Sequence, residues 1–149
     1  MKTCKTLSRS FRILAFALAL LLLVPTGARA EAQPRASNYL STYSGYVSAA
    51  GNGLIHVRFR VEGTGIMDSV GVKSISIYES TDNSSWTWKA TFNSSSTSGM
   101  VSGGTVAYSS SVSYQGVAGR YYRAYICVYA SKNGGSDSDY FWTSTKKAT

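Results

Sequence analysis

Strict alternation of apolar and polar residues between Leu54 and Glu62 is the feature that most constrains the fold of this chain. One set of side chains is apolar and the other is polar: Ile55, Val57, Phe59 and Val61 alternate with His56, Arg58, Arg60 and Glu62. A period of two is that of a β-strand with one buried face and one solvated face. No window after residue 30 shows a sustained apolar repeat of 3.6 residues. The pattern therefore predicts a sheet protein and not a helical one.

The composition after residue 30 agrees with this prediction. That part of the chain has two leucines (Leu40 and Leu54), one proline (Pro34) and all 11 tyrosines, among many serine, threonine and glycine residues. β-Branched and aromatic residues favour strands, and glycine and serine favour the turns between strands.

Residues 1–30 have the pattern of a cleaved secretory signal peptide. Four basic residues precede an uncharged apolar run over residues 13–24: Lys2, Lys5, Arg9 and Arg12. That run is too short to cross a bilayer, which takes roughly 20 residues. Pro25 ends the run, and Ala28-Arg29-Ala30 places small residues at a cleavage site. We expect cleavage after Ala30, secretion, and no membrane attachment afterwards.

Removal of the signal peptide changes the charge and the cysteine count. Ten lysine and arginine residues and seven acidic residues then remain, which gives a net charge of +3. The basic residues are scattered along the sequence. A nucleic-acid-binding face would show them clustered, so we do not expect a nucleic-acid partner. Cys127 is the only cysteine left, so no disulfide can form within the chain. The remaining 119 residues are enough for one domain.

Turn signals divide this part of the chain into about seven strands. Residues 31–37 form a lead-in, and the domain spans 38–147. The expected strands are Asn38–Ala50, with Gly45 as a bulge or kink, Leu54–Glu62, Val72–Glu79, about 86–92, about Thr105–Tyr114, Tyr121–Ala130 and about Asp139–Thr145. Residues 63–71 and 93–104 are the expected longer connections. Without helices to cover parallel crossovers, this order predicts a single antiparallel β-sandwich.

Two segments resemble parts of immunoglobulin-like and fibronectin-III domains. The stretch Tyr122–Ala130, followed by Asn133-Gly134-Gly135-Ser136, resembles the sixth strand and the following turn of fibronectin-III domains. In those domains a tyrosine near the strand start bonds back to the preceding loop. The resemblance gives that role to Tyr122, with Tyr121 as the alternative. The hairpin from Ile75 to Ala90 resembles a connection between the third and fourth strands.

The chain as a whole resembles a family of small secreted proteins of Gram-positive gut bacteria. The segments that carry the resemblance are Asn38-Tyr39-Leu40, Ser111–Gly116 and Lys132–Ser138, and it covers nearly all of residues 38–147. That family is known as a domain of unknown function. The resemblance therefore implies secretion and a single domain, and it implies no activity and no catalytic residues.

Aromatic residues on the last strands form the candidate binding site. If Tyr122, Ala124, Ile126, Val128 and Ala130 face the core, the alternate residues of that strand face outward. Tyr78 and the last strand can join them on the same sheet. The candidate contact residues are Tyr121, Arg123, Tyr125, Tyr129, Tyr140 and Trp142. The surface suits stacking on sugar rings or contact with a protein. The alternative is an aromatic ladder that only stiffens the sheet. Trp86 and Trp88 are assigned to the core.

The titratable residues give weaker candidates. His56 is expected on the surface, and Cys127 is expected to be a packed structural residue, because no neighbour that lowers a thiol pKa is predicted. Glu79 and Asp82 flank one turn and could act as paired carboxylates, but turn acids more often cap backbone amides. Asp137 and Asp139 could bind calcium, although their spacing matches no loop motif. We expect no catalytic residues, no metal and no cofactor.

Three functions follow from these features. The first is a secreted, non-catalytic module that binds a glycan or a protein at the cell envelope or outside the cell. The second is a structural protein that self-associates through exposed strand edges or the aromatic face, since proline and charge protect few of its edges. The third, a small hydrolase, is disfavoured because no nucleophile–base pair is evident.

Overall fold

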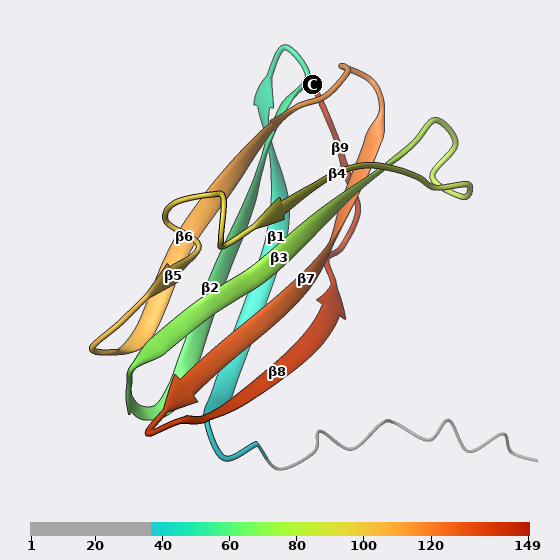
Figure 1. Ribbon diagram of the computed structural model, residues 1–149. Coiled ribbons are helices and arrows are strands. Elements are labelled where there is room, and N and C mark those ends of the chain that lie inside the picture. The colour runs from blue at the N-terminus through green and yellow to red at the C-terminus, as the bar shows by residue number, and fades with distance from the viewer. Residues whose placement is uncertain (1–36) are drawn as a thin grey trace, which may run out of the picture. The chain divides into compact units, whose positions relative to one another are not determined.

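The computed structural model describes residues 37–149, and the signal peptide predicted for residues 1–30 lies outside the described residues. Within residues 37–149 the chain forms nine strands (Figure 1): β1 (Leu40–Gly51), β2 (Leu54–Met67), β3 (Ser69–Ser80), β4 (Thr87–Asn93), β5 (Val101–Ser102), β6 (Thr105–Gln115), β7 (Tyr121–Lys132), β8 (Gly135–Trp142) and β9 (Lys146–Lys147). Seven of these strands are long, and two have only two residues each.

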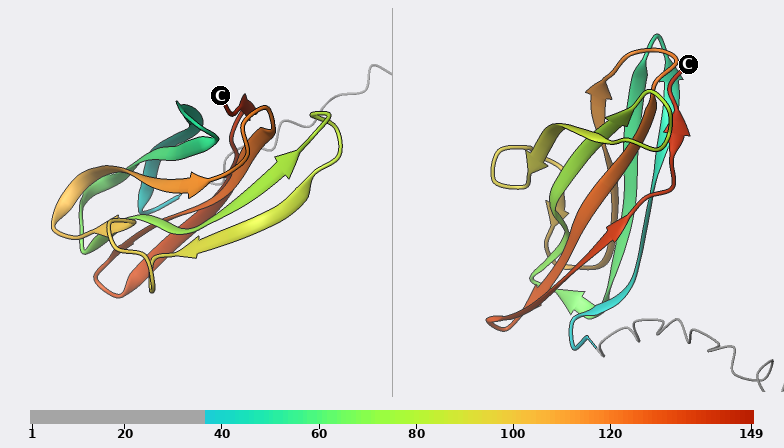
Figure 2. Two further views of the ribbon diagram at one scale, coloured as in Figure 1. Left: turned by 90° about the horizontal axis from the view of Figure 1, so that it is seen from above. Right: turned by 90° about the vertical axis from the view of Figure 1, so that its right-hand side faces the viewer.

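The strands form two antiparallel sheets that face each other (Figure 2). One sheet has the order β1-β2-β6 and the other has the order β4-β3-β7-β8, with β5 and β9 added to the edges of β3 and β7. The predicted antiparallel sandwich is confirmed. The order is that of an immunoglobulin-like sandwich in which the fourth strand pairs with the third.

The core lies between the sheets and follows the predicted alternation. The inward sets of β2, β3 and β7 are all buried: Ile55, Val57, Phe59, Val61, Ile75, Ile77, Tyr122, Ala124, Ile126, Val128 and Ala130. Met67 and Met100 are buried with them. The alternation of β2 and β7 therefore fixes which faces of the two sheets meet, and so which residues point to solvent.

Two parts of the predicted strand layout differ from the structure. The expected loop over residues 63–71 is a tight connection at Asp68, because β2 extends to Met67 and β3 begins at Ser69. The last long strand is Gly135–Trp142 and not Asp139–Thr145. Asn133 and Gly134 both have positive φ and form a tight turn, so β8 begins directly after it, with the polar residues that follow the turn.

Of the two alternatives at Gly45, the register contradicts the bulge, because pairing with β2 is continuous there. The register of β1 and β2 shifts between Leu40 and Thr42 and between Ala49 and Gly51 instead. At Gly45 a Cβ atom would lie 2.9 Å from Cδ1 of Ile126 and 3.1 Å from the ring of Phe141. The glycine allows the opposite sheet to approach closely.

Tyr122 is the tyrosine that bonds back to the preceding loop, as the resemblance implied. Its hydroxyl accepts a hydrogen bond from Val117 N at 2.8 Å and donates one to Glu79 Oε2 at 2.5 Å. Its ring lies over Gly116, where a Cβ would come within 2.6 Å of it. The side chain thereby connects β7, β3 and the loop after β6.

Candidate functional site

The outer face of the β4-β3-β7-β8 sheet carries most of the exposed aromatic side chains. The register places Arg123 opposite Tyr78 of β3, Tyr125 opposite Trp142 of β8, and Cys127 opposite Tyr140. Since the neighbouring residues of β7 point into the core, these side chains share the solvent face of the sheet.

The rings on this face contact one another in a continuous series. Tyr125 stacks on Tyr140 with ring centroids 5.5 Å apart and tilts against Trp142 at 4.7 Å. Trp142 meets Tyr78 edge to face at 5.0 Å. Such pairs add roughly 0.5–1.5 kcal/mol each beyond the area that they bury. The rings therefore hold one another in fixed positions.

Arg123 extends the series by lying between two indole rings. Its guanidinium carbon is 4.3 Å from the centroid of Trp86 and 4.2 Å from that of Trp142. The guanidinium thus makes two cation–π contacts. Arg123 Nε is buried and has no hydrogen-bond partner within the described domain. We call this connected set the aromatic platform: Tyr78, Trp86, Arg123, Tyr125, Tyr140 and Trp142.

The structure brings four of the six predicted contact residues together. The platform includes Arg123, Tyr125, Tyr140 and Trp142. Tyr121 lies at the start of β7 and Tyr129 lies toward its end. The ammonium nitrogen of Lys147 lies 5.3 Å from the ring centroid of Tyr121, and that of Lys73 lies 3.9 Å from the ring centroid of Tyr129. These two tyrosines stand apart from the connected rings.

Trp86 and Trp88 were assigned to the core, and this prediction is wrong. Ala90 pairs with Ile77 and Trp88 pairs with Tyr78, so Lys89 is an extra residue in β4. This bulge reverses the alternation, and Trp88 points to solvent beside Tyr78 with 57% of its surface exposed. Trp86 lies beyond it, against Arg123. The regular spacing of residues 86–92 gives no sign of the bulge.

The bulge places the side chain of Lys89 next to the buried carboxylate of Glu79. Its ammonium group lies 3.1 Å from Oε1 of Glu79, and Arg120 lies 3.5 Å from the same oxygen. Burial acts to raise the pKa of Glu79, but the hydrogen bonds from Tyr122 and Lys89, together with the positive charges of Lys89 and Arg120, outweigh burial and lower the pKa. Glu79 is therefore a structural carboxylate with its oxygens occupied.

The other carboxylates named as candidates also bind groups of the domain itself. The backbone N–H groups of Ser85 and Ser84 bind Asp82 and hold its pKa well below the usual range. Asp137 accepts hydrogen bonds from the Ser37 hydroxyl at 2.6 Å and from Tyr39 N at 2.9 Å. Asp82 thus caps its own turn, and Asp137 fastens the start of β1 to β8.

The remaining candidates are also engaged within the domain: Asp139 and His56 by hydrogen bonds, and Cys127 by packing. Asp139 accepts a hydrogen bond from the Tyr43 hydroxyl at 2.5 Å, across the edge between the sheets. Cys127 points outward but is only 4% exposed, as expected of a packed residue, and its side chain raises the pKa of Tyr140. His56 is half-buried and hydrogen-bonded to the Ser113 hydroxyl at 2.8 Å. Across residues 37–149, no three His, Cys, Asp or Glu side chains gather as a metal site.

The described part of the chain contains no helix long and apolar enough to span a membrane. Comparisons of the chain with models of protein families, with curated proteins and with solved structures find no match.

Proposed function

We propose that this chain is a secreted, non-catalytic binding module that holds a glycan on the aromatic platform. The observation that carries the proposal is the exposure of rings whose positions are fixed by their neighbours. Tyr140 is 55% exposed and Trp142 is 45% exposed, although both pack against Tyr125. If the rings served only to stiffen the sheet, covering each other more completely would stabilise it further.

A fixed set of partly exposed rings suits a sugar ligand. The C–H face of a pyranose packs on a flat aromatic ring, and phenol and guanidinium edges can bond to its hydroxyl groups. Because Arg123 is held between Trp86 and Trp142, its N–H edges are oriented before a ligand arrives. Binding then orders few additional side chains, which reduces the entropic cost of association.

The non-catalytic part of the proposal is supported by the carboxylates. Glu79, Asp82 and Asp137 each accept two or more hydrogen bonds or ion pairs from groups of the domain, which leaves them poorly placed to act on a substrate. Secretion is supported by the signal-peptide pattern of residues 1–30. The proposed location is outside the cell or at its envelope.

The test is a pull-down of the purified protein with insoluble peptidoglycan, mucin and a panel of neutral polysaccharides. The variant Tyr125→Ala/Trp142→Ala removes the centre of the platform, and we expect it to lose binding to the neutral polysaccharides while keeping a β-type circular dichroism spectrum. The control variant Ile66→Ala/Val117→Ala removes two exposed apolar side chains outside the platform (62% and 54% exposed) and should bind as the wild type does.

Two results would contradict the proposal. Full binding of Tyr125→Ala/Trp142→Ala to the neutral polysaccharides would exclude the platform as the contact surface. If the wild type bound no polysaccharide and sedimented as larger species at higher concentration, self-association would replace glycan binding as the function.

A further inference from the structure

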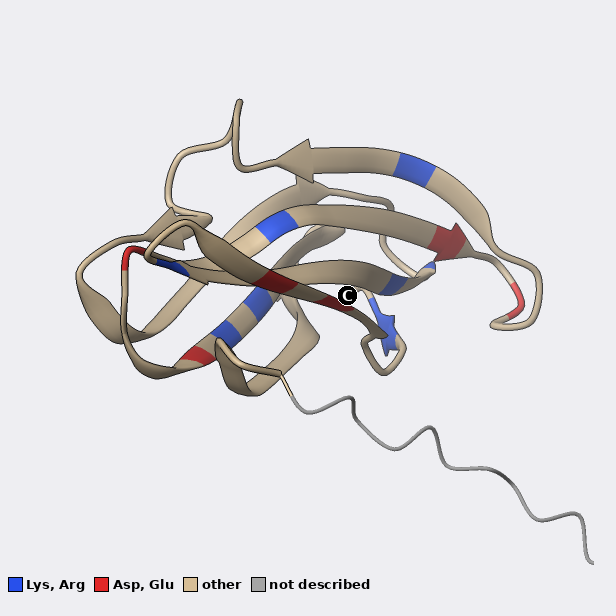
Figure 3. Ribbon diagram, turned by 60° about the horizontal axis from the view of Figure 1, so that its bottom comes forward, with Lys and Arg blue, Asp and Glu red and all other residues tan. Residues whose placement is uncertain are grey.

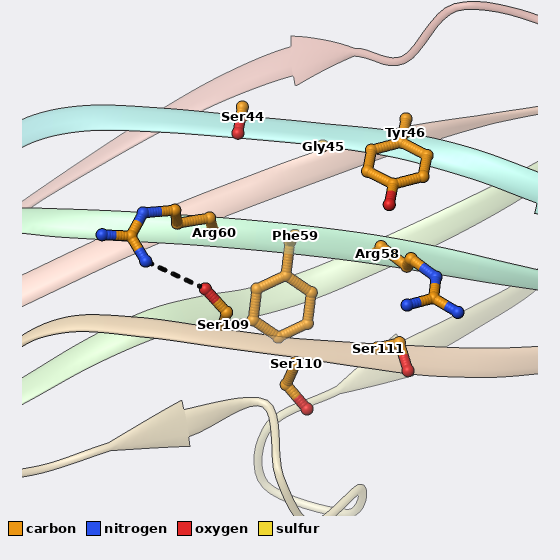
Figure 4. A pocket seen from close by; sticks show the side chains of 9 residues that line it. All are labelled: Ser44, Gly45, Tyr46, Arg58, Phe59, Arg60, Ser109, Ser110 and Ser111. Carbon is orange, nitrogen blue, oxygen red and sulfur yellow. Dashed lines mark hydrogen bonds between the residues drawn. The ribbon is translucent and has the colours of Figure 1, made fainter.

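A second surface lies on the other sheet and is independent of the platform. The outer face of β1-β2-β6 holds a shallow hollow of about 450 Å³ (Figure 4). Three consecutive residues of each strand line it: Ser44, Gly45 and Tyr46 of β1, Arg58, Phe59 and Arg60 of β2, and Ser109, Ser110 and Ser111 of β6.

The register explains the shape of this hollow. Gly45, Phe59 and Ser110 are paired across the three strands and form its middle row. Phe59 is a core residue, and a Cβ at Gly45 would meet Ile126 of the opposite sheet, so this row points inward. The floor of the hollow is therefore backbone, and the side chains of the two flanking rows rise on either side of it.

Each flanking row has an arginine at its centre and hydroxyl groups beside it. One row is Ser44-Arg60-Ser109, and the other is Tyr46-Arg58-Ser111. The two guanidinium groups point toward opposite ends of the hollow (Figure 4). A ligand that meets both must therefore extend along the strands and carry negative charge at more than one position.

The charges of the hollow are largely free for a ligand. Within residues 37–149 Arg58 makes no ion pair, and Arg60 makes an exposed one with Glu62 at 3.5 Å and a hydrogen bond to Ser109 at 3.4 Å. Exposed ion pairs of this kind contribute about 0–1 kcal/mol, so a ligand can displace this one. Figure 3 shows the positive and negative residues along the strands.

We propose that this hollow binds an acidic polysaccharide, whose carboxylate or sulfate groups recur along the chain and pair with Arg58 and Arg60. Guanidinium groups form two parallel hydrogen bonds to such anions. The serine hydroxyls match the hydroxyl groups of sugar rings, and Tyr46, which is 53% exposed, offers a flat face for stacking. An acidic peptide has negative groups but lacks hydroxyl-rich rings that would use Tyr46 and the serines.

The experiment is isothermal titration of the purified protein with polygalacturonate, chondroitin sulfate, galacturonic acid monomer, neutral dextran and poly-L-glutamate. We expect binding to the two acidic polysaccharides, weak binding to the monomer and none to dextran. The variant Arg58→Gln/Arg60→Gln should weaken polysaccharide binding at least about tenfold, since each lost charged hydrogen bond is worth about that factor.

A matched control separates this site from general electrostatics. The variant Lys132→Gln/Lys146→Gln also removes two positive charges, but at positions outside the hollow, and it should bind as the wild type does. The variant Tyr125→Ala/Trp142→Ala should also retain binding, because it leaves the hollow intact even if the platform binds nothing. Equal loss in both charge variants, binding to poly-L-glutamate as tight as to polygalacturonate, or no binding to either acidic polysaccharide would overturn the proposal.

Discussion

The Tyr122 hydroxyl donates a hydrogen bond to Glu79 Oε2 at 2.5 Å, and both side chains are buried. Lys89 and Arg120 contact the other carboxylate oxygen at 3.1 and 3.5 Å. One carboxylate thus connects the tyrosine of β7, the bulge of β4 and the loop before β7. The β4 bulge that places Lys89 on this carboxylate also turns Trp88 toward the solvent face, so the cluster and the aromatic surface depend on the same irregularity.

The first prediction concerns the hydroxyl of Tyr122. In Tyr122→Phe the ring still packs over Gly116, but Glu79 loses a donor and Val117 N loses its acceptor. The free energy of unfolding should fall by about 1–3 kcal/mol, the usual cost of leaving buried polar groups without partners. Urea unfolding measures this change. Tyr46→Phe, which removes an exposed hydroxyl, should change stability by less than about 0.5 kcal/mol. Equal effects of the two variants would contradict the buried network.

The second prediction concerns stability in acid. The folded state lowers the pKa of Glu79, so Glu79 stabilises the fold above its unfolded-state pKa, and this contribution is lost as the pH falls through the lower folded value. Glu79→Gln should lower the free energy of unfolding by about 2 kcal/mol at pH 7. Its difference from the wild type should shrink below about pH 4. Urea unfolding from pH 7 to pH 3 tests this, with Glu62→Gln, at a partly exposed carboxylate, as a control that should change little. A difference that stays constant with pH would rule out the ionised carboxylate as the cause.

The third prediction concerns stability in alkali. The hydrogen bond to Asp139 is the main cause that raises the pKa of Tyr43 to about 12, and burial followed by the hydrogen bond to Glu79 raises that of Tyr122 to about 12. A raised pKa stabilises the fold fully below the unfolded value of about 10, and the contribution is lost as the pH rises from about 10 to 12. Tyr43→Phe should therefore be less stable than the wild type at pH 8 and should lose less stability between pH 10 and 12. An unchanged alkaline decline in this variant would disprove the role of Tyr43.

Alternation predicted the core of this domain because each inward set lies on a regular strand. The pattern at Ile55–Val61 and at Tyr122–Ala130 gave the correct faces, and with them the outward positions of Arg123 and Tyr125. The strand β8 was placed too late because Gly135-Ser136-Asp137-Ser138 has no apolar alternation. Those residues are in a strand because the Asn133-Gly134 turn pairs them with β7, which is a tertiary effect.

The bulge at Lys89 limited the prediction of the platform. A single extra residue reverses every side chain before it, so Trp86 and Trp88 moved from the expected core to the surface. The bulge depends on pairing with β3 and on the attraction of Lys89 to the buried Glu79, and neither is visible in residues 86–92 alone. The position of Arg123 between Trp86 and Trp142 was therefore also beyond sequence-based prediction.

The fourth prediction concerns that position of Arg123. In Arg123→Ala both cation–π contacts disappear, and Trp86 and Trp142 lose the group between them. We expect a loss of about 1–2 kcal/mol in the free energy of unfolding, since each such contact is worth about 0.5–1 kcal/mol where exposed and more where desolvated. Tryptophan fluorescence should also become more sensitive to an added quencher. Arg58→Ala removes an exposed arginine and should affect neither measurement. Unchanged quenching in Arg123→Ala would show that the rings keep their places without the arginine.

The last prediction concerns Gly116, which lies under the ring of Tyr122. A Cβ added at Gly116 would come within 2.6 Å of Cζ and of the hydroxyl oxygen of Tyr122. The ring cannot yield, because its hydroxyl is hydrogen-bonded to Glu79 and Val117. Gly116→Ala should therefore cost about 1–3 kcal/mol, as overpacking does in a dense core. Gly65→Ala is the matched control, since nothing lies within 4 Å of the added Cβ. In the Tyr122→Phe background the cost of Gly116→Ala should become smaller, because the ring without its hydroxyl is free to shift. If the two costs simply add, the alanine acts on the backbone of the loop and not on the ring.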